Sequence, residues 1–309
     1  MQEGPSRTRD DSRAPLLRAL ASGTRPKTLT AAVAPVVVGS ALVVAIAPGA
    51  FLLWLSAFAL MSAVCIQIGT NFFNDVLDFK KGADTEERLG PARLSQTGAL
   101  SARAVTLAGA GAFVLACLFA LPLVWSGGVV IVAIGVASLL CGYLYTGGPA
   151  PLAYVGLGEA FVLLFFGLVA VGGIVYLHTH AFDARALVAG AQIGLLACVL
   201  IAINNLRDRE SDAKAGKRTM AVRLGERRAK FEIAALLAEP FLLGAFWIAR
   251  GWLLAGLLPL VFAPMAVSLV RDVFRTTPSR AYNAFLARSA KIQMGFALLL
   301  SVGLWRAAR

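Results

Sequence analysis

Residues 51–84 read FLLWLSAFALMSAVCIQIGTNFFNDVLDFKKGAD, an apolar run that passes directly into a polar cluster. Its first twenty residues are almost all apolar, which is about the length that an α-helix needs to cross roughly 30 Å of hydrocarbon. Asn71, Asn74, Asp75 and Asp78 then follow at positions i, i+3, i+4 and i+7, so on a helix they share one face. The stretch therefore predicts a membrane-spanning helix that ends in a polar stripe, which faces the interior of a helix bundle because lipid does not solvate it.

Apolar stretches of similar length recur along the rest of the chain. The 309-residue chain is 58% hydrophobic, whereas soluble domains are about 45–50% apolar, so a bilayer is the expected solvent. Short connections that contain Gly and Pro separate several stretches, which predicts antiparallel neighbours. We expect an all-α membrane protein with nine transmembrane helices. The expected spans are 29–47, 51–70, 101–124, 128–145, 152–176, 185–204, 231–249, 252–270 and 288–305.

The basic residues are distributed as a membrane topology requires. The formal net charge is +12, from 29 Lys and Arg against 17 Asp and Glu. With nine spans and a cytoplasmic N-terminus, nearly all basic residues fall on the cytoplasmic side, as the positive-inside rule predicts. The four exceptions are Arg185, Arg250, Arg306 and Arg309. The charge excess is therefore explained by topology, and no nucleic-acid partner is needed.

The chain divides into a tail and one membrane domain. Residues 1–22 are polar and Arg-rich and lack the apolar core of a signal peptide, so we expect a disordered cytoplasmic tail. Residues 23–309 are expected to form a single transmembrane domain in the cell (inner) membrane. Its functional site is expected on the cytoplasmic face, where the polar stripe of residues 71–78, here called the first acidic cluster, and a second acidic cluster described next both lie.

A second acidic cluster follows the sixth expected span. Asn204, Asp208 and Asp212 are spaced i, i+4 and i+8, which predicts one face of a helix. Stacked carboxylates repel one another unless a cation lies between them, and Mg²⁺ prefers oxygen ligands that it bridges to substrate phosphates. We therefore predict that the two clusters face each other and hold Mg²⁺ ions that bind a diphosphate, so that the metal stabilises the charge on the leaving group.

Specific residues follow from this hypothesis. The predicted catalytic residues are Asp75, Asp78, Asp208 and Asp212. Basic side chains in the same loops are available to contact phosphate oxygens directly. These are Lys80, Lys81, Lys217 and Arg218.

Other polar side chains in apolar surroundings are few. Glu159, near the cytoplasmic start of the fifth span, is expected either to contact the acceptor or to order a helix. Tyr143 and Tyr145 end the fourth span, and their spacing does not place both on one helical face. We expect one of them to bind the acceptor and the other to anchor the helix at the interface. His178 and His180 fall in a short expected loop and are interpreted as solvated.

Four segments carry a resemblance to a known family. They are RPKTL at 25–29, NFFNDVLDFKKGADTEERLGP at 71–91, GYLYTGGP at 142–149 and GKRTMAVRLG at 216–225. Together they resemble the UbiA superfamily of intramembrane aromatic prenyltransferases, and within it the 1,4-dihydroxy-2-naphthoate polyprenyltransferases of menaquinone synthesis. The resemblance covers about residues 24–305.

The resemblance implies nine transmembrane helices around a central cavity, with Mg²⁺ and a polyprenyl diphosphate at the cytoplasmic rim. The implied reaction is attack by an electron-rich ring carbon on an allylic cation, with loss of carbon dioxide from the carboxylate-bearing carbon, giving a demethylmenaquinone. Position 82, where the commonest superfamily motif has a third aspartate, is Gly, and the role of the nearby Asp84 stays open. The implied metal ligands are Asn71, Asp75, Asp78, Asn205, Asp208 and Asp212, and the implied diphosphate contacts include Asn74, Lys217 and Arg218.

Two alternatives remain open from the sequence. The same fold would also serve another aromatic acceptor, such as 4-hydroxybenzoate, although residues 79–91 and 216–225 argue against this. A secondary transporter would place its ionisable groups near the bilayer midplane, at broken helices. The acidic residues gather instead at cytoplasmic helix ends, which favours an enzyme whose lipid substrate keeps its tail in the bilayer.

Overall fold

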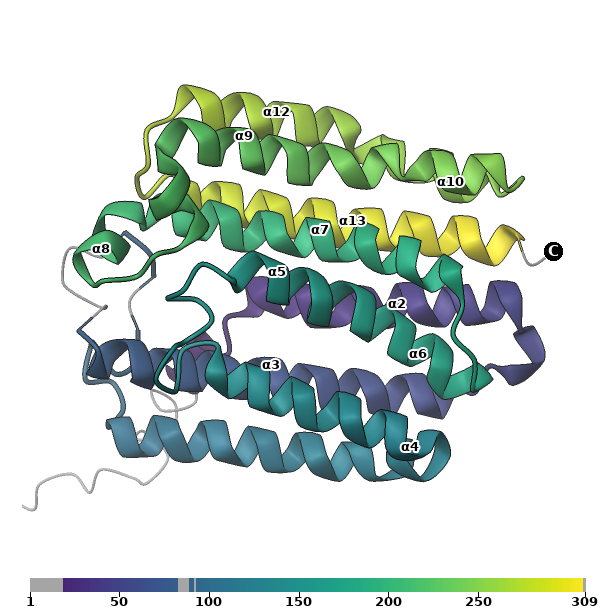
Figure 1. Ribbon diagram of the computed structural model, residues 1–309, viewed down its shortest axis with the longest axis horizontal. Helices are drawn as coiled ribbons and strands as arrows, with labels where there is room; N and C mark the ends of the chain where they lie inside the picture. The colour runs from purple at the N-terminus through teal and green to yellow at the C-terminus, as the bar shows by residue number, and fades with distance from the viewer. Residues whose placement is uncertain (1–18, 83–88, 92, 308–309) are drawn as a thin grey trace, which may run out of the picture.

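The described part of this computed structural model, residues 19–82, 89–91 and 93–307, consists of helices and the segments that join them. Figure 1 shows the long helices lying side by side in one bundle. Eight helical runs within the described residues are long and apolar enough to cross a membrane. The prediction of an all-α, multi-pass membrane protein is therefore confirmed.

The helices overlap the expected spans, but the fifth span begins at Gly158 rather than 152 and the seventh at Met220 rather than 231. Several helices are continued by short 3₁₀ or π segments. The single helices of the first half are α2 (Pro26–Ile46), α3 (Leu53–Lys80) and α4 (Ala102–Leu144). α5 (Gly158–Leu163), η2 (Leu164–Leu168) and α6 (Val169–Thr179) form one run, followed by α7 (Ala184–Arg207) and the short α8 (Arg209–Lys214). The C-terminal part contains α9 (Met220–Leu242), α10 (Gly244–Ala249), α11 (Leu253–Leu257), η3 (Leu258–Phe262), α12 (Ala263–Arg275) and α13 (Tyr282–Ala307).

α4 contains both spans that were expected at 101–124 and 128–145. Ser101 caps it by accepting a hydrogen bond from the backbone N–H of Ala104. A straight helix of its 43 residues would be about 65 Å long, roughly twice the hydrocarbon thickness. Gly128 interrupts it with φ 62° and ψ −151°, a conformation that residues with a Cβ rarely adopt. Figure 1 shows α4 reversing direction near its label.

α7 is the most enclosed helix of the bundle, and α4 is the most open. Seventeen of the 24 residues of α7 are buried, because it packs against α2, α5, α9 and α13. Gly167 of η2 lies so close to α7 that an added Cβ would come within 2.5 Å of the Gly190 carbonyl oxygen. On α4, large apolar side chains such as Trp125 and Leu121 are exposed. An exposed apolar surface of this kind is expected where a helix contacts lipid.

Two local expectations differ from the structure. Residues 19–22, which were assigned to the tail, are helical, and Ala19 and Leu20 pack against a cluster that includes Phe72; residues 1–18 lie outside the described part. The interpretation of His178 as a solvated loop residue is wrong. It is buried near the end of α6, where its Nδ1 lies 2.9 Å from the Ile174 carbonyl oxygen.

Candidate active site

The polar stripe predicted on α3 is buried inside the bundle. Asn71, Asn74, Asp75 and Asp78 are each 9% exposed or less. Asn71 Nδ2 donates to the carbonyl oxygen of Thr24 at 2.9 Å, which joins the stripe to the start of α2. The stripe therefore faces other helices, as the spacing of its residues predicts.

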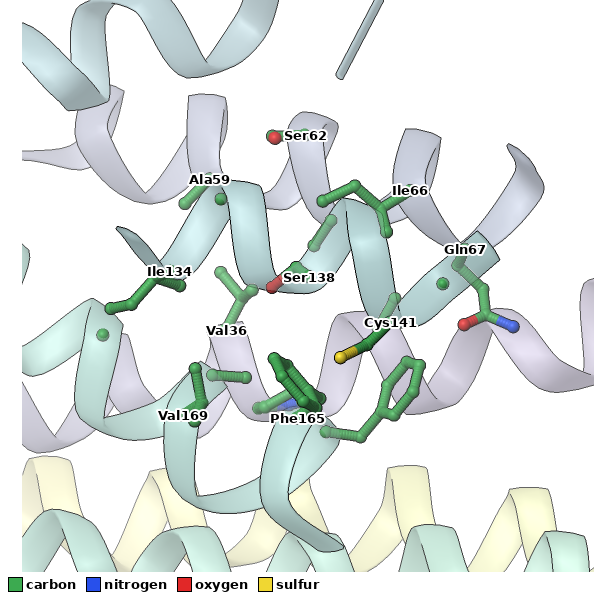
Figure 2. A pocket seen from close by; sticks show the side chains of 18 of the residues that line it. Val36, Ala59, Ser62, Ile66, Gln67, Ile134, Ser138, Cys141, Phe165 and Val169 are labelled. Atoms are coloured by element: carbon green, nitrogen blue, oxygen red, sulfur yellow. The ribbon is translucent and has the colours of Figure 1, made fainter. Parts of the chain in front are cut away.

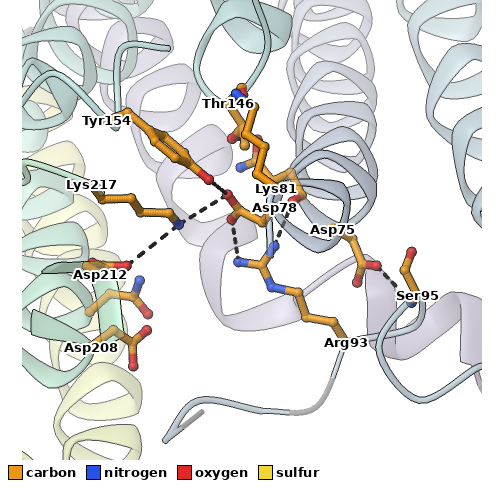
Figure 3. Close-up of polar contacts among 12 residues, drawn as sticks. Asp75, Asp78, Lys81, Arg93, Ser95, Thr146, Tyr154, Asp208, Asp212 and Lys217 are labelled. Atoms are coloured by element: carbon orange, nitrogen blue, oxygen red, sulfur yellow. Dashed lines mark hydrogen bonds and ion pairs between the residues drawn. The ribbon is translucent and has the colours of Figure 1, made fainter. Parts of the chain in front are cut away.

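Residues 93–95 lie against these carboxylates (Figure 3). The two oxygens of Asp75 accept hydrogen bonds from the backbone N–H groups of Leu94 and Ser95, at 3.0 and 2.9 Å. Arg93 forms an ion pair with Asp78 at 2.8 Å and donates to the Asn74 carbonyl oxygen at 2.6 Å. Residues 93–95 thus supply both charge and hydrogen bonds to the first acidic cluster.

Lys217 joins the two acidic clusters, which lie far apart in the chain. Its Nζ is 3.1 Å from Asp78 Oδ1 and 3.6 Å from Asp212 Oδ1. All three side chains are buried, so the ammonium takes the place of a cation between two carboxylates. Figure 3 shows Asp208 beside Asp212 on the same side of Lys217. The predicted convergence of the ends of α3 and α7 is therefore present in the fold.

Tyr154, in the segment between α4 and α5, holds the centre of this arrangement. Its hydroxyl donates to Asp78 Oδ1 at 2.9 Å. Lys81 and Lys217 place their ammonium groups 4.6 and 4.8 Å from the centre of its ring, within the range of a cation–π contact. Burial, and then the Asp78 carboxylate, raise the pKa of Tyr154. The phenol therefore stays protonated and remains a hydrogen-bond donor.

The second acidic cluster does not lie on one continuous helix, so that prediction is wrong in detail. α7 ends at Arg207, and Asp208 joins it to α8 with non-helical backbone angles. The break allows Arg207 to turn back and contact both oxygens of Asp208, at 2.8 and 2.6 Å. Arg207 also donates to Asn283 Oδ1 of α13 at 2.6 Å. Asp208 and Asp212 are nevertheless both buried.

The predicted diphosphate-binding residues differ in whether their side chains contact the buried cluster. Lys81 is exposed, but its ammonium group reaches the cluster and donates to the Thr146 carbonyl oxygen at 2.6 Å. Thr146 in turn donates to Asn74 Oδ1. The side chains of Lys80 and Arg218 are exposed, so the fold does not bring them into the buried cluster with Lys217.

The predicted acceptor-binding residues also separate. Tyr143 is 42% exposed and lies edge-on to Phe73, whereas Tyr145 lines the interior cavity. This agrees with the expectation that the two rings cannot share one face. Glu159 Oε1 accepts a hydrogen bond from Asn205 Nδ2 at 2.8 Å, so Glu159 orients an amide of the second acidic cluster.

An apolar cavity lies inside the bundle (Figure 2). Its wall comes from α2, α3, α4 and the run from α5 to α6, and it extends along α3 from Ala59 to Thr70. Gln67 and Tyr145 line its polar end. Gln67 hydrogen-bonds to Asn71, and Tyr145 precedes Thr146, so this end adjoins the carboxylates. The arrangement suits a molecule with a charged head and a long apolar tail.

The oxygen-rich donor set of the polar cluster fits Mg²⁺. Carboxylate and amide oxygens are the ligands that this ion prefers, and Lys217 already occupies a position between two carboxylates. Within residues 19–82, 89–91 and 93–307, however, no three acidic, histidine or cysteine side chains converge on one point. Arg93, Arg207 and Lys217 neutralise the carboxylates in this arrangement.

Four residues of the site were missed in the sequence. Arg93 and Tyr154 lie in connecting segments, where no helical periodicity marks an inward-facing side chain. In the sequence, Arg207 lies within the second acidic cluster, between Asn205 and Asp208. This position is the signal that could have identified it as a site residue. Asn283 had no signal, since it reaches Arg207 only through the packing of α13. Asp84, whose role was left open, lies outside the described residues.

Buried charges of both signs lie beside an apolar cavity within a membrane bundle, an arrangement that suits an intramembrane enzyme for an amphiphile with an anionic head. Residues 32–297 match the model of the UbiA prenyltransferase family. The chain belongs to this family and is a prenyltransferase.

Related proteins resemble the chain along most of its length. It is 35% identical to a 1,4-dihydroxy-2-naphthoate octaprenyltransferase of Haemophilus influenzae, covering 91% of this chain and 93% of that protein. It is 37% identical to a Mycobacterium tuberculosis protein of the same name, covering 80% and 82%. A UbiA homologue from Archaeoglobus fulgidus, bound to DMAPP and Mg²⁺, shares the fold with a TM-score of 0.61 and 18% identity, over 92% of this chain and 99% of that one.

Proposed function

We propose that this enzyme transfers a polyprenyl group from polyprenyl diphosphate to 1,4-dihydroxy-2-naphthoate, with Mg²⁺ and with loss of carbon dioxide and diphosphate, to give the quinol form of a demethylmenaquinone. The names of the relatives at 35% and 37% identity support this acceptor. The observation that carries the proposal is the ion-pair bridge from Asp78 through Lys217 to Asp212 at the polar end of an apolar cavity. A diphosphate head fits among these charges, and its polyprenyl tail fits the cavity.

The metal would be held by oxygens from both acidic clusters. When bound, Mg²⁺ neutralises the diphosphate and stabilises the charge that develops on this leaving group. Asn71 Oδ1 accepts one hydrogen bond from Gln67 and keeps a second lone pair for a metal. The proposed ligands are Asn71, Asp75, Asp78, Asn205, Asp208 and Asp212.

The chain's own basic residues bind and orient the diphosphate. Lys217, Lys81 and Arg93 converge on Asp78 or on the Tyr154 ring beside it, and charge-assisted hydrogen bonds from such groups to phosphate oxygens are strong. The Asn74 amide lies in the same cluster. Lys80 and Arg218, at the exposed rim, are proposed to meet the diphosphate as it enters.

The proposed topology has nine membrane crossings and a cytoplasmic N-terminus. Eight runs are long and apolar enough to cross, and the reversal of α4 at Gly128 makes two crossings from one of them. The basic residues then lie mainly on the cytoplasmic side. The active site opens on the cytoplasmic face of the cell (inner) membrane, where the soluble acceptor is available.

A competition assay tests this function. Purified enzyme in lipid nanodiscs receives one long polyprenyl diphosphate, Mg²⁺ and an equal mixture of dihydroxynaphthoate, 4-hydroxybenzoate and homogentisate. We expect mass spectrometry to detect prenylated, decarboxylated naphthoquinone as the main product, and EDTA to abolish it. A main product derived from another ring would replace the proposed acceptor, and turnover that persists in EDTA would refute the role of the metal.

A further inference from the structure

Gln67 carries a buried hydrogen-bond acceptor at the wall of the cavity. The residue lies on α3, is 8% exposed and lines the cavity near its polar end (Figure 2). Its Oε1 has no hydrogen-bond partner among the residues that the structure describes. A buried carbonyl oxygen without a donor is unfavourable, so this position calls for a ligand that brings one.

The hydrogen-bond network fixes which atom of the Gln67 amide is left over. A backbone carbonyl only accepts hydrogen bonds, so the contact with the Thr24 carbonyl oxygen at 2.9 Å identifies the Asn71 nitrogen. The Asn71 oxygen must then face Gln67, whose Nε2 donates to it at 3.2 Å. The Gln67 oxygen is therefore the atom without a partner, and the assignment follows from the backbone of Thr24.

Gln67 lies on the cavity side of the polar cluster. It contacts Asn71, one helical turn away, and lies eight residues before Asp75, which is about 12 Å along the axis. The cavity wall around it is mostly apolar and includes Ile66 and Phe165. A polyprenyl tail offers no hydrogen-bond donor, so it does not satisfy this oxygen. A hydroxylated aromatic ring does.

We propose that Gln67 Oε1 accepts a hydrogen bond from an aromatic hydroxyl of the acceptor and so orients the ring in the cavity. This inference rests on the proposed function, in which the carboxylate-bearing carbon of the ring faces the allylic carbon at the diphosphate end. The 1-hydroxyl is adjacent to that carboxylate, and the 4-hydroxyl lies on the more remote side of the ring. The 4-hydroxyl is therefore the group that Gln67 binds.

A cycle of two enzymes and two acceptors tests the contact. The enzymes are the wild type and Gln67→Met, which keeps a similar volume but lacks the amide. The acceptors are 1,4-dihydroxy-2-naphthoate and 1-hydroxy-2-naphthoate, which lacks only the 4-hydroxyl and keeps the 1-hydroxyl next to the reacting carbon. We expect Gln67→Met to lower kcat/KM for the dihydroxy acceptor about tenfold, the order expected for one hydrogen bond. With the deoxy acceptor the two enzymes should differ less than about twofold.

The cycle also separates this contact from indirect effects. Gln67→Met leaves Asn71 Oδ1 without its donor, but a loss caused by Asn71 would appear equally with both acceptors. Equal losses with both acceptors, or a change confined to the KM of polyprenyl diphosphate, would overturn the proposal. If no prenylated naphthoate forms even with the wild type, the proposed function fails instead.

Two further variants make the test robust. Ser62→Ala is the matched control, because Ser62 lines the same cavity on the same helix and its hydroxyl already donates to the Ala116 carbonyl oxygen at 3.0 Å. We expect Ser62→Ala to leave the ratio of the kcat/KM values for the two acceptors unchanged. Gln67→Asn retains an amide on a shorter side chain and is used if Gln67→Met does not fold. Gln67→Asn should also lose the wild-type difference in kcat/KM between the two acceptors. If this variant keeps the full difference, the result counts against the contact.

Discussion

Replacing Lys217 with Met removes the ammonium that contacts both Asp78 and Asp212. The side chains of Lys217, Asp78 and Asp212 are 10%, 6% and 11% exposed, so the two carboxylates would be left facing each other away from water. Removing one partner of a buried ion pair costs about 3–5 kcal/mol. Arg93 and Tyr154 still contact Asp78, which places the expected loss near about 3 kcal/mol. At roughly 2 °C per kcal/mol for a chain of this size, Tm should fall by about 6 °C.

Mg²⁺ should reverse much of this loss, because a divalent cation between the carboxylates replaces the missing ammonium and stabilises the folded state by binding to it. The assay is thermal unfolding of Lys217→Met and the wild type in the same lipid or detergent, with EDTA and then with Mg²⁺. The exposed Lys291 on α13 provides the matched control, since Lys291→Met removes a lysine far from any acidic cluster described above. A Lys217→Met protein as stable as the wild type in EDTA, or an equal Mg²⁺ shift in both, would refute the reasoning.

Three other variants test separate parts of the structure. Asp75→Asn and Asp208→Asn should each abolish metal-dependent prenyl transfer while the protein stays in the membrane fraction; full activity of either variant would remove that residue from the mechanism. Gly128→Ala should lower Tm, because a Cβ at φ 62° costs about 1–2 kcal/mol. Gly111→Ala, which has open space at the new Cβ, should not lower it. Equal Tm values for the two variants would contradict the reversal of α4. Tyr154→Phe keeps the ring that contacts two ammonium groups but loses the phenol donor, so kcat/KM for polyprenyl diphosphate should fall about five- to tenfold. A change in kcat/KM for the acceptor alone would argue against this placement of Tyr154.

The fold was predictable because each helix carries its own signal. A run of about twenty apolar residues identifies a membrane span without any knowledge of its neighbours, and the stripe from Asn71 to Asp78 indicates which side of α3 faces inward. The ends of helices were less predictable. The polar stripe extends α3 to Lys80, beyond the apolar run, since buried partners stabilise residues that lipid would not. The break at Gly128, by contrast, falls where the sequence separates the expected spans 101–124 and 128–145.

The site was predictable as far as its residues belong to helical patterns. The two acidic clusters converge, and Lys217 lies between them. Side chains in connecting segments were not predictable, since Arg93 and Tyr154 reach Asp78 only through tertiary contacts. The burial of His178 was also not predictable. Its short polar segment suggested a solvated loop, yet the helix continues to Thr179 and buries the imidazole.

The balance of charge explains why so many bases surround these aspartates. Buried carboxylates stay ionised only with a counter-charge or hydrogen bonds, and here Asp78 has Arg93 and Lys217 while Asp208 has Arg207. Mg²⁺ would bring its own charge to the carboxylates, and the diphosphate would bring opposite charge for the displaced bases, so the site stays nearly neutral throughout. Arg207 is held on three sides, by Asn204, Asp208 and Asn283. We therefore propose that Arg207 keeps its place and fixes Asp208, and that Lys217 and Arg93 are the bases that would exchange carboxylate for phosphate.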